Sequence, residues 1–181
     1  MNSFYSREEL EDIGFSSIGN NVWISRKASI YSASTISLGN NVRIDDFVIL
    51  SGKITIGSYV HISAYVALYG SKGIAINDYS GVSAHSVVYS AVDDFSGEFM
   101  IGPMFPVNMT HVIGGLVTLD RYTQIGASCI VMPNLVIPEG TVIGAMSFVN
   151  RTLEPWSIYA GIPVHKLRDR NKSLLKLNPY E

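Results

Sequence analysis

The sequence lacks the features typical of membrane, disulfide-stabilised secreted or nucleic-acid-binding proteins. Its 181 residues include one cysteine, Cys129, which excludes an internal disulfide framework and suits a reducing compartment. No apolar run approaches the roughly 20 residues that a membrane-spanning helix needs. The formal net charge is −2 and no basic block is present, so neither nucleic acid nor membrane insertion is expected. The first residues lack the basic and apolar regions of a signal peptide, which predicts a cytoplasmic location.

What the sequence does contain is an aliphatic residue at every sixth position over most of its length. Two extra residues interrupt the count within 31–35 and again within 69–73, where we expect bulged corners. An irregular stretch interrupts it after Val88. The series comprises Ile18, Ile24, Ile30, Leu38, Ile44, Leu50, Ile56, Ile62, Leu68, Ile76, Val82, Val88, Leu119, Ile125, Val131, Ile137, Ile143 and Val149.

A second series, two positions earlier, holds small or β-branched residues such as Val42, Val60 and Thr123. Residues i and i+2 point to the same face of a strand, so each hexapeptide is a short strand with two inward side chains, followed by a corner. An α-helix would scatter these positions around its whole surface. The pattern therefore predicts an all-β fold over 18–150, a parallel β-helix of about six triangular coils within a single domain, 1–181.

Both ends of the chain depart from the repeat. Ser6 and Glu9 have the spacing of a capping box, which predicts a short helix over 7–12. Residues 163–178 combine leucines with five basic residues, and we expect a helix there that covers the open end of the solenoid.

Residues 90–115 form the longest segment without a repeat. The segment contains several Gly and Pro residues and many aromatics, and loops of this length in compact proteins are usually functional. We therefore expect a protruding loop that carries part of an active site.

The C-terminal repeats resemble the hexapeptide-repeat acetyltransferases, a family of left-handed β-helices. The resemblance rests on Ile125-Gly126-Ala127-Ser128, Val142-Ile143-Gly144-Ala145 and Ile158-Tyr159-Ala160-Gly161-Ile162-Pro163, which look like the end of the galactoside, O-antigen and capsule sugar acetyltransferases. It implies a bacterial, acetyl-CoA-dependent enzyme that acetylates an amino or hydroxyl group of a sugar, such as a nucleotide-linked amino sugar in O-antigen or capsule synthesis. It also implies a homotrimer with active sites between subunits, and no metal.

The same resemblance suggests which residues bind the cofactor. Ala127 and Ala145 would line the groove that holds the pantetheine arm, where only small side chains fit. Asn150 and Arg151 occupy the turn after the last repeat. Arg168 lies where a basic residue would meet the CoA phosphates, and a guanidinium binds phosphate bidentately. Each of these residues can alternatively be an ordinary corner or surface residue.

The general base is left open by the sequence. Acyl transfer requires a proton to leave the attacking group, and histidine is the usual base because its pKa lies near neutrality. The galactoside-type histidine position is occupied here by Asp93 or a close neighbour, so Asp93 and Asp94 are candidates. His85, at a corner before the loop, and His111, in its returning limb, are the others. A carboxylate at this position favours an amine acceptor over an alcohol.

Three alternatives remain at this stage. One is a galactoside-type O-acetyltransferase. Another is a zinc-dependent carbonic anhydrase on the same fold, but the four histidines lack the required spacing. The third is a non-catalytic structural solenoid, which would need no long irregular loop.

Overall fold

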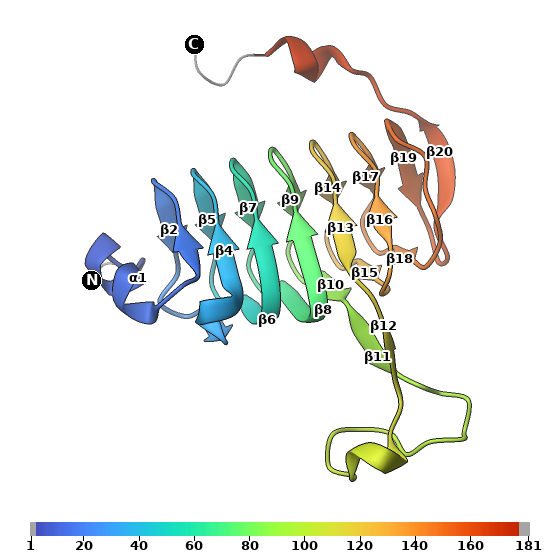
Figure 1. The fold of residues 1–181 in the computed structure, drawn as a ribbon. Coiled ribbons are helices and arrows are strands. Elements are labelled where there is room, and N and C mark those ends of the chain that lie inside the picture. Colours follow the sequence, from blue (N-terminus) through green and yellow to red (C-terminus); the bar gives the residue numbers. More distant parts are fainter. Residues whose placement is uncertain (1–2, 178–181) are drawn as a thin grey trace.

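The computed structural model describes residues 3–177 and shows a parallel β-helix, in which short strands coil around one axis and stack as three faces (Figure 1). The first face has seven parallel strands, which gives one coil more than the repeat predicted. Its members are β2 (Val22–Ile24), β5 (Val42–Ile44), β7 (Val60–Ile62), β9 (Gly81–Val82), β14 (Gln124–Ile125), β17 (Val142–Ile143) and β19 (Ser157–Ala160).

The second and third faces share two strands that bend around the prism edge between them. These are β6 (Ile49–Ile56) and β8 (Ala67–Ile76). The second face adds β3 (Ser29–Tyr31), β10 (Val87–Tyr89), β15 (Ile130–Val131) and β18 (Phe148–Val149). The third face adds β1 (Ser17–Ile18), β4 (Ile36–Leu38), β13 (Val117–Leu119) and β16 (Val136–Ile137). A 3-10 turn, Ala33–Thr35, occupies the first predicted corner insertion, whereas 69–73 continues as strand within β8.

The aliphatic series predicted from the sequence forms the core. Every member is buried except Ile18 and Ile30, which are half-buried in the first coil. Burying each such side chain contributes roughly 1.5–3 kcal/mol. The second inward series turns polar toward the C-terminal coils, and its hydroxyls bond corner carbonyls: Ser86 Oγ, for example, donates to the Gly126 carbonyl at 2.8 Å.

The extra coil was missed because its inward residues leave the aliphatic pattern. Tyr159 stands directly above Ile143 in the β17–β19 ladder and is buried. Its hydroxyl accepts a hydrogen bond from the Glu154 backbone at 2.9 Å. A tyrosine can close the core here because its polar end reaches a backbone donor at the end of the solenoid.

Corner residues in the left-handed backbone region are stacked from coil to coil. Tyr59, Tyr79 and Tyr122 all have φ near +60°, and their rings stack with centroids 5.3 and 5.0 Å apart. Bulky residues rarely adopt positive φ. Stacking of rings at the coil spacing offsets part of that cost.

The N-terminal helix is confirmed as α1 (Arg7–Ile13). Its capping box is complete, because Ser6 Oγ accepts from the Glu9 backbone and Glu9 Oε2 accepts from the Ser6 N–H at 2.7 Å. Leu10 is buried against the first coil, so the helix covers the N-terminal end of the core.

The predicted C-terminal helix over 163–178 is wrong. The chain instead forms β20 (His165–Asp169), antiparallel to β19, and a 3-10 turn at Ser173–Lys176; residue 178 lies outside the described part. The last strand of a parallel stack has unpaired backbone groups, and β20 satisfies them as a helix could not. The bulge between Ile158 and Tyr159 lets Lys166 reach both Glu154 and Asp169, at 2.7 and 2.8 Å.

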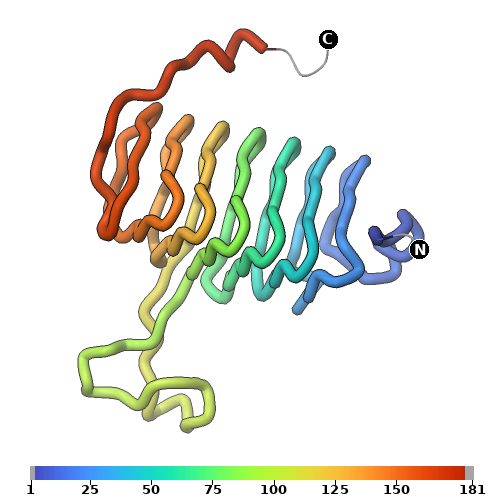
Figure 2. Tube along the Cα trace, turned by 180° about the vertical axis from the view of Figure 1, so that it is seen from behind, coloured from blue at the N-terminus to red at the C-terminus, as the bar shows by residue number. Residues whose placement is uncertain are grey.

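The long loop is confirmed as a protrusion, but it has structure of its own. β11 (Ala91–Asp93) and β12 (Val112–Gly114) pair as an antiparallel stem, and Val107–Met109 forms a 3-10 turn near the tip. Figures 1 and 2 both show this hairpin leaving the solenoid at the edge between the second and third faces. None of the helices within residues 3–177 is long and apolar enough to cross a bilayer.

Candidate active site

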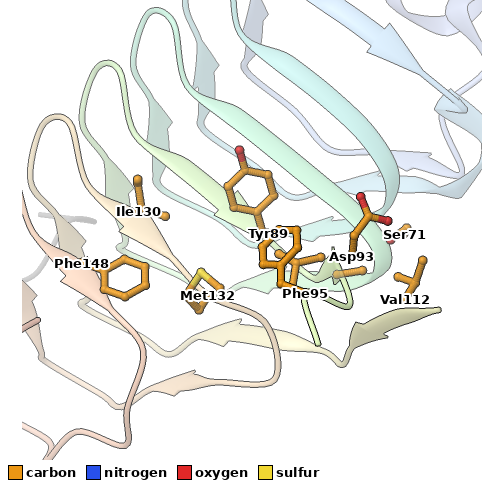
Figure 3. A pocket seen from close by; sticks show the side chains of 10 residues that line it. Ser71, Tyr89, Asp93, Phe95, Val112, Ile130, Met132 and Phe148 are labelled. Atoms are coloured by element: carbon orange, nitrogen blue, oxygen red, sulfur yellow. The ribbon is translucent and has the colours of Figure 1, made fainter. Parts of the chain in front are cut away.

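A cleft lies on the outer side of the second face, beneath the hairpin stem. Its apolar half has a volume of about 610 Å³. In Figure 3, Ile130 and Phe148 lie on the coil side of this half, and Asp93, Phe95 and Val112 come from the hairpin. The cleft thus joins regular coils to the segment that breaks the repeat.

A second hollow of about 710 Å³ continues the cleft toward the N-terminal coils. It is lined by glycines, serines and tyrosines, and it shares Ser71, Tyr89, Ala91 and Asp93 with the apolar half. Asp93 is therefore the charged group at the junction of an apolar and a more polar compartment.

Strand alternation places Asp93 in the cleft. Ala91 and Asp93 lie on one side of β11 and line both hollows, Val92 lines the apolar one alone, and Asp94, the residue after the strand, lines neither. Antiparallel pairing of Asp93 with Val112 fixes the backbone from which the carboxylate projects.

The other two loop candidates, Asp94 and His111, form a pair. His111 Nδ1 lies 2.9 Å from Asp94 Oδ2, and the Asp94 N–H donates to the His111 carbonyl at 2.9 Å. The His111 hydrogen bond, reinforced by the Ser96 backbone N–H, lowers the pKa of Asp94 to about 2. An ionised carboxylate only accepts hydrogen bonds, so Nδ1 carries the proton. The pair connects the two strands of the hairpin at the end of the stem that lies away from the solenoid.

His85 is separate from these three residues. It lies at the edge between the first and second faces, with φ of 62°, and its ring stacks on Tyr65 with centroids 4.8 Å apart. The hairpin leaves from the opposite edge of the second face. The structure thus brings Asp94 and His111 together, places Asp93 in the cleft, and leaves His85 across the face.

The predicted cofactor residues Ala127 and Ala145 stack on that same edge. The Met146 N–H donates to the Ala127 carbonyl at 2.8 Å, and the Ser128 N–H donates to the Ala84 carbonyl at 2.9 Å. Three alanines from successive coils therefore form one column, which we name the alanine column (Ala84, Ala127 and Ala145). Their short side chains leave room for an extended chain along the edge.

The remaining cofactor candidates are spread over the C-terminal coils. Asn150 and Arg151 are exposed in the turn after β18. The Met132 N–H donates to the Val149 carbonyl, so Asn150 lies one coil beyond Met132 at the rim of the apolar half. Arg168 is exposed on β20 opposite Ile158, on the first face, and does not line the cleft.

Sequence reasoning missed several residues of the site. Tyr89, Ile130 and Phe148 occupy outward positions of repeat strands, which a search for inward periodicity ignores. Their large apolar side chains at outward positions were the available signal. Among residues 3–177 no cluster of three potential metal ligands is found.

Comparison with known proteins agrees with this geometry, although no family model matches the chain. The dTDP-4-amino-4,6-dideoxy-D-glucose acyltransferase of Escherichia coli is 40% identical over 172 residues, covering 93% of this chain and 90% of that protein. The chain belongs to the hexapeptide-repeat acyltransferases. The galactoside O-acetyltransferase of Escherichia coli K12 is more distant, at 26% identity over 91% of this chain and 69% of its own.

Among solved members of this acyltransferase family is AntD, an N-acyltransferase from Bacillus cereus. The AntD chain in the complex with dTDP and 3-hydroxybutyryl-CoA is 54% identical in sequence to this chain. The two structures superpose with a TM-score of 0.95 over 97% of this chain and 94% of AntD. AntD with one serine replaced by cysteine was solved with dTDP-4-amino-4,6-dideoxyglucose and coenzyme A. The predicted enzyme class and fold are thereby confirmed.

Proposed function

We propose that this acyltransferase moves an acyl group from an acyl-CoA, acetyl-CoA in the simplest case, to the amino group of a dTDP-linked 4-amino-4,6-dideoxyhexose. The observation that carries the proposal is Asp93, a carboxylate that lines both hollows of the cleft where they meet. Neither half is lined by histidine. The identity with the Escherichia coli and AntD acyltransferases supports the same acceptor.

The chemistry requires little help to activate the acceptor. The neutral amine attacks the thioester carbonyl carbon, a C–N bond forms and the carbonyl electron pair moves to oxygen. Collapse of this intermediate breaks the C–S bond and releases CoA thiolate. The nitrogen proton passes to the departing thiolate, directly or through Asp93, so the products are an amide and CoA thiol. Once the amine has attacked, its nitrogen is positively charged and loses a proton far more readily than a hydroxyl does, which explains how a carboxylate can serve here.

The spacing of two residues that were replaced in AntD supports Asp93, rather than Asp94, as the carboxylate that acts in the site. AntD has been solved with an aspartate replaced and with a serine replaced, and these two residues lie ten positions apart. In this chain Ser83 and Asp93 have that spacing, whereas the residue ten before Asp94 is Ala84. We therefore assign Ser83 and Asp93 to the site and give Asp94 and His111 the role of holding the hairpin.

The alanine column would take the pantetheine arm of CoA, whereas Asn150 and Arg151, at the hairpin edge, would contact a CoA held by the column of another copy. In one chain this column and Asp93 lie at opposite edges of the second face. A second copy that places its alanine column against the hairpin would complete the site, and a closed ring of three copies satisfies every site equally. The second face also presents exposed Tyr31, Tyr69 and Ile130 for such an interface. We therefore propose a homotrimer with sites between subunits, acting on surface-glycan precursors in the bacterial cytoplasm.

The decisive experiment offers the purified protein acetyl-CoA or 3-hydroxybutyryl-CoA together with dTDP-4-amino-4,6-dideoxyglucose or a simple galactoside. Mass spectrometry should detect an amide of the nucleotide sugar and little galactoside ester. Asp93→Asn should lower kcat by roughly 10²–10⁴-fold, the range for loss of a proton acceptor. Faster galactoside acylation would establish the O-acetyltransferase instead. Sedimentation equilibrium tests the trimer, and a monomer would contradict the shared site.

A further inference from the structure

The side chain of Gln124 lies across the first face and bonds Ser83. Its Nε2 is 3.0 Å from Ser83 Oγ and 3.1 Å from the Ile125 carbonyl oxygen. A backbone carbonyl can only accept a hydrogen bond, so the amide atom beside it must be the nitrogen. The orientation of the Gln124 amide is thereby fixed, and Gln124 donates to Ser83.

This polarity determines what the Ser83 hydroxyl can do. Its oxygen is occupied as an acceptor, and among residues 3–177 no acceptor for its own O–H is found. Ser83 is half-exposed and directly precedes Ala84 of the alanine column. Its proton is therefore available to a molecule lying along that edge.

Gly81 is what allows Gln124 to reach Ser83. Gln124 stands beside Gly81 in the β14–β9 ladder, and a Cβ at position 81 would lie 2.6 Å from Gln124 Oε1. Any larger residue would push the amide away from Ser83. The contact between Gln124 and Ser83 therefore depends on the absence of a side chain at Gly81.

We propose that Gln124 is a positioning residue that directs the Ser83 O–H outward, where it donates to the thioester carbonyl oxygen as negative charge develops. This inference rests on the proposed acyl transfer. A hydroxyl that already accepts a hydrogen bond is polarised and becomes a better donor. A donor fixed before the reaction stabilises the oxyanion without reorganising, which is the main effect of such groups.

Exchanging the donor and the acceptor in the hydrogen bond between residue 124 and Ser83 tests the proposal. In Gln124→Glu the carboxylate has nearly the same shape but accepts the Ser83 proton. We expect kcat to fall by about 10²–10³-fold, as for removal of one oxyanion donor, and Ser83→Ala to match it. The double variant should be no slower than either single one, since both remove the same hydrogen bond. His61→Gln, an outward change on the same face, is the control and should retain wild-type kcat.

A measurement without the acceptor sugar separates this proposal from the proposed function. With carbonyl-labelled acetyl-CoA bound, infrared difference spectra should show a lower C=O stretching frequency in the wild type than in Ser83→Ala or Gln124→Glu. Equal frequencies in all three proteins, or rate losses that add in the double variant, would overturn the role of Gln124. If the frequency shift is present but no tested amino sugar is acylated, the acceptor is wrong and the Ser83 donor stands.

Discussion

Two glycines in matched repeats allow a test of how closely the coils pack beside the alanine column. Gly126 and Gly144 each occupy the Ile-Gly-Ala sequence before a column alanine. A Cβ at Gly126 would lie 2.6 Å from the Ala145 backbone nitrogen and 2.7 Å from the Ile143 carbonyl oxygen. A Cβ at Gly144 would meet only the Ala160 side chain, at 3.0 Å, with the nearest backbone oxygen 3.4 Å away.

The two alanine variants should therefore differ. Gly126→Ala must separate two hydrogen-bonded coils, because its Cβ would lie within 2.7 Å of two backbone atoms, whereas the Cβ of Gly144→Ala comes no closer than 3.0 Å to any atom. Overpacking of this kind costs about 1–3 kcal/mol, and for a chain of this size each kcal/mol lowers Tm by about 2–4 °C. We expect Tm to fall by about 2–12 °C in Gly126→Ala and by no more than a few degrees in Gly144→Ala.

Differential scanning calorimetry measures the stability difference, and titration with acetyl-CoA measures its consequence for the site. Gly126 directly precedes Ala127, so separating the coils should also weaken acetyl-CoA binding, more in Gly126→Ala than in Gly144→Ala. Equal Tm values for the two variants, or a Gly126→Ala protein as stable as the wild type, would refute the reasoning from backbone contact.

Three further predictions concern other parts of the chain. Because the pKa of Asp94 is lowered to about 2, its stabilisation of the hairpin is complete above its ordinary pKa of 3.8 and is lost as the pH falls toward 2; the hydrogen-exchange protection factors of the stem amides should fall in that window, and Asp94→Asn should abolish the change. Cys129 is buried, which raises the pKa of its thiol, so iodoacetamide should label it only after unfolding, as mass spectrometry can show. Tyr159→Phe removes the hydroxyl that accepts from the Glu154 N–H and should cost about 0.5–1.5 kcal/mol in urea unfolding, the net contribution of one ordinary hydrogen bond.

The sequence was sufficient for the regular part of the fold because the repeat obeys one local rule. A strand with two inward residues and a corner accounts for the core from Ile36 to Val149 without knowledge of distant contacts. The C-terminal segment shows where that rule ends. Leu167 and its basic neighbours suit an amphipathic helix, yet the free edge of β19 decides the outcome, and an edge exists only in the assembled solenoid.

The site could be predicted only in part, for a related reason. The sequence alone identified the loop as functional, the family that the chain resembles, and Asp93 as one candidate for the base. Which of Asp93 and Asp94 faces the cleft depends on the β11–β12 register. The contact between Gln124 and Ser83 depends on the register of β9 with β14 across the intervening hairpin, and no local pattern reveals it.

The regular coils and the irregular hairpin contribute different parts of the proposed site. Stacked coils hold Ala127 and Ala145 in register, so in the proposed function the edge that receives the acyl-CoA costs little to organise on binding. The hairpin interrupts the stack and projects a carboxylate that no hexapeptide could supply, since outward residues of the coils stay close to their own face. The alanine column and the Asp93 carboxylate lie at opposite edges of one face. In the proposed function a single chain therefore holds both parts of the site but cannot bring them together, which is why we propose that copies of the chain associate.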